Sequence, residues 1–513
     1  MIKKIFKPIS TGNASALIAL TSLLSYAVGL LRDRTIAVHF GTTTATDTYN
    51  ASFLIPDMLF NLFIAGALIA AFMPIFSEYL VKDKQEADRV ANIVLTGASM
   101  LISILAIIAF IFIQDIIPAI FPTIGLEGQQ NIIIMTRLML PSALLFSISN
   151  TLGNILMTYR HFTAFAISPV LYNLGIIFGV VFLNERYGIY SAAIGVLIGA
   201  FLHLTIRIID ISRTTFKFKP QLDLKHPGIK RIIKLMIPKS LSLIAWQANL
   251  YIFAIVGMRI TEGGLAAFNF ARNIQSFAVS LFGIAFATAV FPALNAAINR
   301  GDKEDFTKNI QTTVERILFF TIPAAVGVTL LAEPITDLIL GGGEFGEEST
   351  RLTAVILTFF AISIPFESLT QIFARAFYAM KNTVTPMLIN IFSLSIIALI
   401  TIFVAPTYGI QWFSIGFTIG FVIYNILFII LISKKLKGFK VKRFIKTFMK
   451  IALSSIIMGL TIHYSSNIDL GVHKAISGIA IGGGIYLLTA YGLGIEELNS
   501  INILFKRIFK KHE

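Results

Sequence analysis

The chain has 513 residues, of which 56% are hydrophobic and only 13% charged, and its formal net charge is +15. A soluble domain usually carries about 25% charged residues, so this composition excludes an ordinary soluble protein. The sequence contains no cysteine, which excludes disulfides, thiol catalysis and thiolate metal sites. Lys and Arg lie in short clusters between apolar runs, a distribution that disfavours nucleic-acid binding.

Apolar runs of about twenty residues recur from end to end, each long enough to cross a bilayer about 30 Å thick. Continuous runs predict an all-α polytopic membrane protein rather than a β-barrel, which has short alternating segments. The first run follows "MIKKIFKPIS" without a small-residue cleavage site, so we expect a retained helix. In chain order, fourteen transmembrane helices are expected near residues 14–40, 46–80, 90–121, 128–158, 162–184, 188–210, 229–258, 264–298, 306–340, 351–379, 384–405, 409–433, 442–465 and 472–495.

Basic residues cluster in every second loop and at both ends of the chain, whereas the loops between are nearly free of them. By the positive-inside rule these clusters, and both termini, are cytoplasmic. Two termini on one side require an even number of spans, which supports fourteen. The acidic ninth loop, "LGGGEFGEEST", is expected outside, so a cytoplasm-only reporter should work after Lys219 or Lys437 and fail after Glu344.

The first six predicted helices resemble the next six. "FMPIFSEYLVKDKQEADR" is similar to "FPALNAAINRGDKEDFTK", and "SPVLYNLGIIFG" to "TPMLINIFSLSI", which pairs Asn173 with Asn390. The matches keep a spacing of about 220 residues, or six spans, so they form a parallel repeat typical of alternating-access transporters. We therefore expect two pseudo-symmetric six-helix lobes, residues 1–215 and 216–440, followed by residues 441–513 with two extra helices and a basic tail.

Arg32, Asp33 and Arg34 stand together inside the first apolar run. A charge at the centre of a membrane helix costs about 2.5–3.5 kcal/mol. Snorkelling to the interface is one interpretation; the other is that these charges face a water-filled cavity that accepts an anion. Neighbouring helix positions point about 100° apart, so Arg32 and Asp33 cannot both face lipid favourably, and we favour the cavity.

Further polar residues of the spans are candidates for substrate binding. In the second span Asp47 either caps a helix start or faces substrate, and Asp57, after Pro56, suits the start of a second half-helix. Arg137, Glu367 and Arg375 are weaker candidates that could pair internally. The full predicted substrate site comprises Arg32, Asp33, Asp47, Asn61, Arg272 and Asn273.

Several site classes find no support in the sequence. No Gly-rich phosphate loop follows a strand, and no His, Asp and Glu cluster has metal-ligand spacing, so neither a metal nor a cofactor is expected. "GGGEFG" at Gly341 is interpreted as a turn in an outer loop. "GIAIGGG" near Gly478 has the spacing of small residues that favours close helix packing.

The stretch "SYAVGLLRDRTIAVHFGTTTATDTYNASFLIPDMLFNLFIAGALIAAFMPIFSEY" resembles the start of the MurJ (MviN) lipid II flippases. These belong to the multidrug/oligosaccharidyl-lipid/polysaccharide exporter superfamily, and the likeness extends over the whole chain. It implies transport of undecaprenyl-diphosphate-linked peptidoglycan precursor across the bacterial plasma membrane by a non-enzymatic, monomeric protein. It also implies that Arg32, Asp33 and Asp47 line a cationic cavity and that the lipid tail follows a groove near the last two helices.

The chain departs from the family pattern at several positions. Tyr26, Phe60 and Asn61 stand at usually basic places, and Ala65 at an acidic one. The usual Arg of the eighth helix aligns with Asn273, one place after Arg272. Phe253 and Thr401 replace the acids that some members use for sodium, so ion coupling is not implied.

Three other functions compete with the lipid II flippase. One is a flippase for another polyprenyl-linked oligosaccharide or an exporter of the same superfamily, although antiporters have twelve spans. Another is a membrane glycosyltransferase, for which Asp33 is the only tempting catalytic carboxylate. The last is a scaffold without transport.

Overall fold

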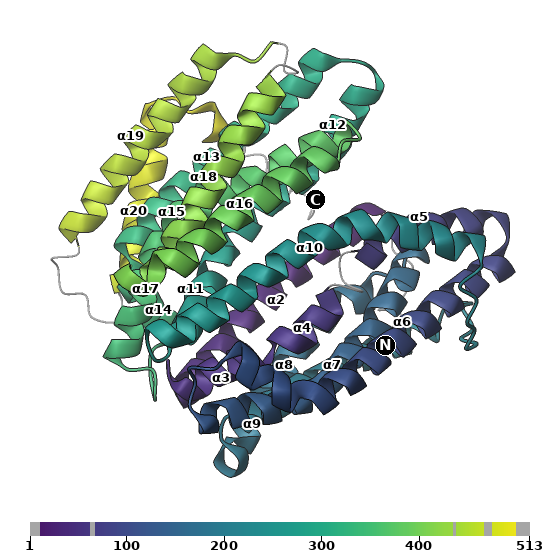
Figure 1. The fold of residues 1–513 in the computed structure, drawn as a ribbon. Coiled ribbons are helices and arrows are strands. Elements are labelled where there is room, and N and C mark those ends of the chain that lie inside the picture. Colours follow the sequence, from purple (N-terminus) through teal and green to yellow (C-terminus); the bar gives the residue numbers. More distant parts are fainter. Residues whose placement is uncertain (1–10, 62–66, 434–437, 466–473, 499–513) are drawn as a thin grey trace. The chain divides into compact units, whose positions relative to one another are not determined.

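The computed structural model describes residues 11–61, 67–433, 438–465 and 474–498 (Figure 1). The expected basic clusters at both ends of the chain, Lys437 and Ala65 lie outside the described residues. The chain divides into two compact units, residues 1–266 with 342–346 and residues 267–341 with 347–513. In the described residues both units consist of helices, and the single bridge of β type joins Gly342 and Phe345.

The first unit contains the helices numbered up to α10. Their bounds are α2 Thr11–Phe40, α3 Thr44–Ser52, α4 Leu54–Phe60, α5 Ala67–Lys82, α6 Lys84–Ile120, α7 Leu126–Thr158, α8 Thr163–Tyr187, α9 Tyr190–Ile211 and α10 Pro227–Ile260. The second expected span is interrupted, because α3 ends at Ser52 and α4 begins at Leu54, with Pro56 in its first turn. Proline cannot donate to a helix ladder, which agrees with the half-helix expected at Asp57.

The second unit contains the later helices, of which α11 begins with three residues that belong to the first unit. A π-helical segment, Val279–Ile284, separates α11 from α12. The bounds are α11 Gly264–Ala278, α12 Ala285–Asn299, α13 Lys303–Leu330, α14 Ala332–Leu340, α15 Glu347–Ala379, α16 Val384–Phe403, α17 Ala405–Tyr408, α18 Gln411–Ser433, α19 Val441–Ser465, α20 Lys474–Gly492 and the 3-10 turn Glu496–Leu498.

Twelve helices of the described chain are long and apolar enough to cross a membrane. They correspond to the third to fourteenth expected spans. The first two expected spans fall on α2, which carries three consecutive charged residues, and on the interrupted α3–α5. The protein is therefore a multi-pass membrane protein, and the total of fourteen spans stays a prediction.

The first unit extends further along the chain than the first predicted lobe. It includes α10, whereas the repeat places a lobe boundary at residue 215. The helix is joined to this unit by side-chain contacts such as the Tyr251 hydroxyl, which donates to the Leu54 carbonyl at 3.1 Å. The predicted boundary describes the sequence repeat, and the compact unit describes which helices pack together.

Helices α8 and α9 pack at backbone contact. A Cβ placed on Gly175 would lie 2.3 Å from Gly199 Cα, and one on Gly179 would lie 2.5 Å from Gly195 Cα. Two small residues four positions apart on each helix let membrane helices approach this closely. The contact fixes the position of α8, which carries part of the polar cluster described below.

The loop 342–346 belongs to the first unit although its neighbours in sequence belong to the second. The Glu344 amide donates to the Val38 carbonyl at 2.9 Å. Gly343 has φ +56°, and a Cβ there would lie 2.2 Å from Val38 O; Gly41 has φ +60°, and its Cβ would lie 2.6 Å from Glu344 O. Only glycine fits these conformations and distances, which explains why glycines flank this turn.

The last two helices, α19 and α20, pack on each other and on α13, and α20 also contacts α14. A Cβ on Gly478 would lie 2.8 Å from Leu331 Cδ2, and one on Gly482 would lie 2.6 Å from Ile462 Cδ1. The Tyr486 hydroxyl donates to the Phe319 carbonyl at 2.6 Å. The packing interpretation of "GIAIGGG" is confirmed by these contacts.

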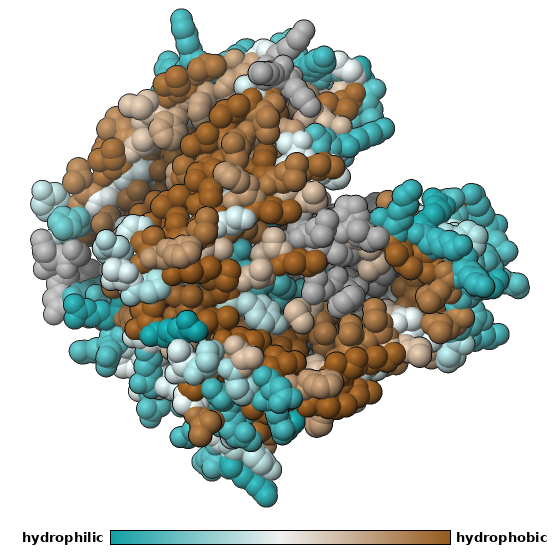
Figure 2. Space-filling view, viewed as in Figure 1, coloured by the Kyte–Doolittle hydropathy of each residue, from teal (hydrophilic) through white to brown (hydrophobic). Residues whose placement is uncertain are grey.

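Large apolar side chains are exposed along the helices of both units. Figure 2 shows hydrophobic side chains along α16 and α18. Exposed large apolar surface of this extent is incompatible with water and suits lipid. On α16 the exposed residues are Val384, Leu388, Phe392, Leu399, Ile402 and Phe403.

Candidate functional site

Arg32 and Asp33 form an ion pair inside the first unit. Arg32 Nη2 donates to Asp33 Oδ1 at 2.6 Å and Nε donates to the same oxygen at 3.0 Å, while Nη1 donates to Asn173 Oδ1 at 3.0 Å. Asp33 is 4% exposed, and the Arg32 side chain is 23% exposed. Arg32 therefore points toward Asn173 on α8, and the choice between a substrate cavity and snorkelling to the interface stays a prediction.

Further polar side chains surround this pair from other helices of the same unit. Tyr49 of α3 and Tyr172 of α8 both lie within electrostatic range of Arg32 and of Asp57 on α4. Tyr251 of α10 also lies within range of Asp57. We call the seven residues from these five helices the polar cluster: Arg32, Asp33, Tyr49, Asp57, Tyr172, Asn173 and Tyr251.

Asn173 was not among the predicted site residues, although one signal for it exists in the sequence. It pairs with Asn390 in the internal repeat, and an amide at a repeated position inside an apolar helix needs a partner. In the structure its amide nitrogen donates to the carbonyls of Pro169 and Ser25, at 3.2 and 3.4 Å, while its oxygen accepts from Arg32. Asn173 thus links α8 to α2. The tyrosines have no comparable signal.

Asp47 lies apart from the polar cluster and binds backbone instead. Its Oδ1 accepts from the Ala266 amide at 2.8 Å, and the residue is 2% exposed. The carboxylate therefore caps the first turn of α11, where unpaired amides favour an anion. Asp47 thus caps α11 and not the start of its own helix, and its contact with substrate stays a prediction.

A second carboxylate cap, reciprocal to the first, lies next to it. Glu262, in the turn before α11, accepts from the Thr44 amide at 3.2 Å and the Thr44 hydroxyl at 2.7 Å, at the first residue of α3. These two hydrogen bonds lower the pKa of Glu262 below its ordinary value. Each of the two helix starts is thus capped by a carboxylate adjoining the other.

Asn61 ends α4 and is half-buried, four residues after Asp57. Its amide donates along the helix to the Asp57 carbonyl. Asn61 is thus joined to Asp57 of the polar cluster by a backbone hydrogen bond, and a role of its side chain toward substrate stays a prediction.

Arg272 lies in the second unit, where Glu367 and two aromatic rings contact it. Its Nη2 donates to Glu367 Oε1 at 3.3 Å, and its guanidinium carbon lies 4.7 Å from the Phe417 ring centroid and 5.8 Å from that of Phe360. Cation–π contacts of this kind stabilise a partly desolvated arginine. Gln275 donates to the other Glu367 oxygen at 2.8 Å. These contacts join α11 to α15 and α18.

Of the remaining candidates, Arg137 and Arg375 make hydrogen bonds to neighbouring helices. Asn273 follows Arg272 on α11 and is half-buried. Arg137 Nε donates to the Phe110 carbonyl at 3.3 Å, and Arg375 Nη2 donates to Thr288 Oγ1 at 2.9 Å. The alternative that Arg137, Glu367 and Arg375 pair internally agrees with these contacts.

The sequence interpretation missed a buried basic residue in the first unit. Arg207 of α9 is 2% exposed, and it donates to the Ser149 carbonyl at 2.7 Å, Asn150 Oδ1 at 3.1 Å and Ser168 Oγ at 3.1 Å. A Cβ on Gly153 would lie 2.6 Å from its Nη1. Neutral acceptors on α7 and α8 therefore hold this cation. In the sequence, Arg207 stands near the end of an apolar run, so it resembles a basic residue of the following loop.

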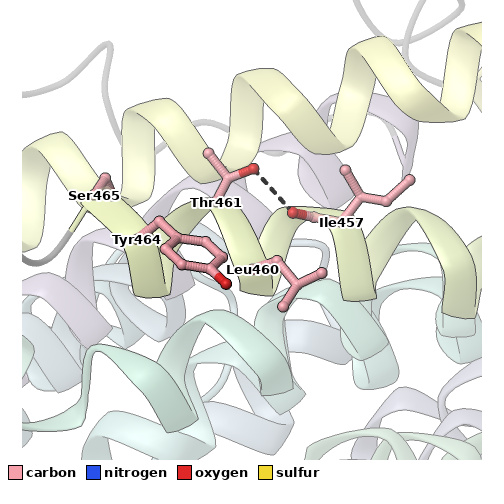
Figure 3. A pocket seen from close by; sticks show the side chains of 5 residues that line it. All are labelled: Ile457, Leu460, Thr461, Tyr464 and Ser465. Carbon is pink, nitrogen blue, oxygen red and sulfur yellow. Dashed lines mark hydrogen bonds between the residues drawn. The ribbon is translucent and has the colours of Figure 1, made fainter.

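A surface pocket of about 510 Å³ lies along the end of α19 (Figure 3). Apolar side chains and three hydroxyls line it, and the Thr461 hydroxyl is already bonded to the Ile457 carbonyl at 2.9 Å. With its hydroxyl engaged, Thr461 presents a methyl group, so the pocket suits hydrocarbon. The lining residues are Ile457, Leu460, Thr461, Tyr464 and Ser465.

Comparison with known proteins places these features in a family. Residues 36–478 match the family model described as lipid II flippase MurJ. A "Probable lipid II flippase MurJ" of Rickettsia prowazekii is 28% identical over 494 residues, which cover 93% of this chain and 97% of that protein. A "Lipid II flippase MurJ" of Burkholderia cenocepacia is 26% identical and covers 81% and 82%.

The solved structures agree in fold. A structure titled "Lipid II flippase MurJ, inward closed conformation" superposes with a TM-score of 0.80 at 25% identity, and covers 93% of this chain and 98% of that one. The multi-pass helical fold and the match over more than four-fifths of the sequence lead to one assignment: this chain belongs to the lipid II flippase MurJ family.

Proposed function

We propose that this protein transports lipid II, an undecaprenyl-diphosphate-linked peptidoglycan precursor, from the inner to the outer leaflet of the bacterial plasma membrane. Family membership over residues 36–478 is the observation that carries the proposal. Translocation makes and breaks no covalent bond, so the protein acts as a transporter and not an enzyme. It works as a monomer with both termini in the cytoplasm.

Arg32 is the proposed contact for the diphosphate. A guanidinium has five N–H groups in a planar fork, and three of them donate to Asp33 and Asn173 among the described residues. Two N–H groups are left for phosphate oxygens, which Arg binds in bidentate geometry. Asp33 and Asn173 hold the fork in place, so Asp33 acts by positioning Arg32 and limiting the net charge.

The other predicted residues have distinct proposed roles. Arg272 offers a second cation in the second unit, with Asn273 and Asn61 as hydrogen-bonding groups for the sugars or peptide. Asp47 is bound to Ala266 in this structure, so its contact with substrate would require that cap to open. The lipid tail is proposed to lie along α19, whose pocket and exposed residues Met449, Ile456 and Leu460 are apolar.

Complementation tests the function. A bacterium depleted of its own lipid II flippase should regain growth and lipid II translocation when this chain is expressed. Failure of rescue at normal membrane levels of the protein would favour a flippase for another polyprenyl-linked oligosaccharide. That alternative would then be tested by translocation of the corresponding lipid in vesicles.

Topology provides a separate prediction. A reporter that is active only in the cytoplasm should be active when fused after Lys219, in the basic loop between α9 and α10, and inactive after Glu344. The expectation follows from the bias of Lys and Arg toward cytoplasmic loops. Enzyme activity per fusion molecule is the measurement, and activity at Glu344 would contradict the proposed orientation.

A further inference from the structure

The 3-10 turn Glu496–Leu498 packs on α13 and α20, and the turn and α13 each carry a buried glutamate. Glu497 is 5% exposed and Glu315 of α13 is 1% exposed. One oxygen of each, Oε2, has no hydrogen-bond partner. The two side chains lie close enough for the charge of Glu315 to act on Glu497. A buried carboxylate without partners is costly to ionise, and here the cost is increased by a like charge.

Few groups near this pair can offset the negative charge. Arg443 of α19 lies 3.7 Å from Glu315 Oε2, but its Nη2 also donates to Glu496 at 3.0 Å. Lys450 of α19 is engaged by the Gly494 carbonyl at 3.1 Å. Within the part of the chain that the structure describes, Arg443 is the single cation in contact with a glutamate of this group.

The remaining neighbours are neutral. Gln311 donates to Glu315 Oε1 at 2.8 Å and also bonds the backbone of Lys440 in both directions. Tyr486 of α20 uses its hydroxyl on the Phe319 carbonyl. No group of three or more His, Cys, Asp or Glu side chains with metal-binding geometry occurs among the described residues. The arrangement therefore suits a proton better than a metal ion.

We propose that Glu497, facing Glu315, is a proton-binding site that controls docking of the 3-10 turn onto α13. With the proton bound, the turn stays buried and completes the end of α20. When the proton leaves to water, Glu497 becomes a second buried anion beside Glu315, and the turn moves out to solvent. The proposal does not depend on which substrate the protein transports.

The direction of the pH dependence follows from the burial of Glu497. Burial, and secondarily the charge of Glu315, raises the pKa of Glu497 above its ordinary value of 4.5. The docked turn then binds the proton more tightly than the undocked turn does. Docking is complete below about pH 4.5 and weakens as pH rises through the raised pKa, tenfold for each unit by which that pKa is raised.

The absence of cysteine from the chain allows a direct test. Leu498→Cys is introduced into the full-length protein in detergent, and its labelling by a neutral maleimide is measured from pH 4.5 to 9. Rates are divided by those of the unfolded protein at each pH, which removes the titration of the thiol itself. We expect the corrected rate to rise with pH, tenfold for each unit by which docking raises the pKa of Glu497.

Two glutamine variants distinguish the site from its neighbour. Glu497→Gln is isosteric with the protonated acid, so the corrected rate should stay low and independent of pH. Glu496→Gln is the matched control: its side chain is 74% exposed, and the rise with pH should persist. A flat profile in the parent protein, or an equal rise in Glu497→Gln, would overturn the proposal. Fast labelling of Glu497→Gln at every pH would also do so, because the turn would then depend on the charge.

Discussion

Replacement of Arg32 by alanine should abolish rescue of a flippase-depleted bacterium while membrane levels of the protein stay near normal. Removal of a desolvated, hydrogen-bonded charge from a binding site costs about 2–5 kcal/mol, which corresponds to about thirtyfold or more in transport. Arg32→Lys should rescue only in part, since lysine keeps the charge but lacks the planar fork. Growth rescue and translocated lipid II per molecule are the measurements.

Two controls separate a binding role for Arg32 from a structural one. Arg300→Ala removes an exposed arginine that pairs with Asp305, and an exposed pair contributes only about 0–1 kcal/mol, so transport should be retained. Asp33→Asn should leave abundance unchanged but alter transport if Asp33 sets the charge of the site. Parental transport in Arg32→Ala would remove Arg32 from the substrate site and leave Arg272 as the remaining candidate.

Replacement of Gly199 by leucine should eliminate folded protein. A Cβ at this position would lie 2.3 Å from the Tyr172 carbonyl oxygen and 2.9 Å from Tyr172 Cδ2, so α8 and α9 would have to separate. A leucine gains at most about 1 kcal/mol of helix propensity over glycine, whereas even one extra methylene in a packed site costs about 1–3 kcal/mol. The displaced segment of α8 carries both Tyr172 and Asn173, so damage should reach the polar cluster.

The matched control is Gly484→Leu, on α20. Gly484 is exposed, and a Cβ there would meet no heavy atom within 4 Å. Its thermal unfolding in detergent and its yield after gel filtration should equal those of the parent. Gly199→Ala should lie between the two. Parental stability of Gly199→Leu would show that the two helices are not held at backbone contact.

Much of the fold was accessible from apolar periodicity. A run of about twenty predominantly apolar residues specifies a membrane helix through local composition alone, so the third to fourteenth expected spans coincide with helices. Small residues at helical spacing also indicated the packing around Gly478. The helix break at Phe53 was close to prediction, because Pro56 acts through its own missing amide.

The contacts of the candidate site could not be predicted from sequence patterns, because they join residues that are distant in the chain. Asn173, which bonds Arg32, is 141 positions away in the chain, and only the repeat indicated that it mattered. The partner of Asp47 is the backbone amide of Ala266, a group that every residue except proline possesses. Composition likewise cannot tell that α10 packs with α3–α6, because its apolar residues would suit either unit.

The docking of the loop 342–346 onto Val38 has a consequence for biosynthesis. The first unit lacks this loop until residue 346 has been made, long after Ala266 has left the ribosome. At about 5–20 residues per second, the intervening stretch takes on the order of several seconds to synthesise. During that time the Val38 carbonyl and the turn at Gly41 lack their contacts with Glu344. The nascent first half therefore has to persist in the membrane as an incomplete intermediate.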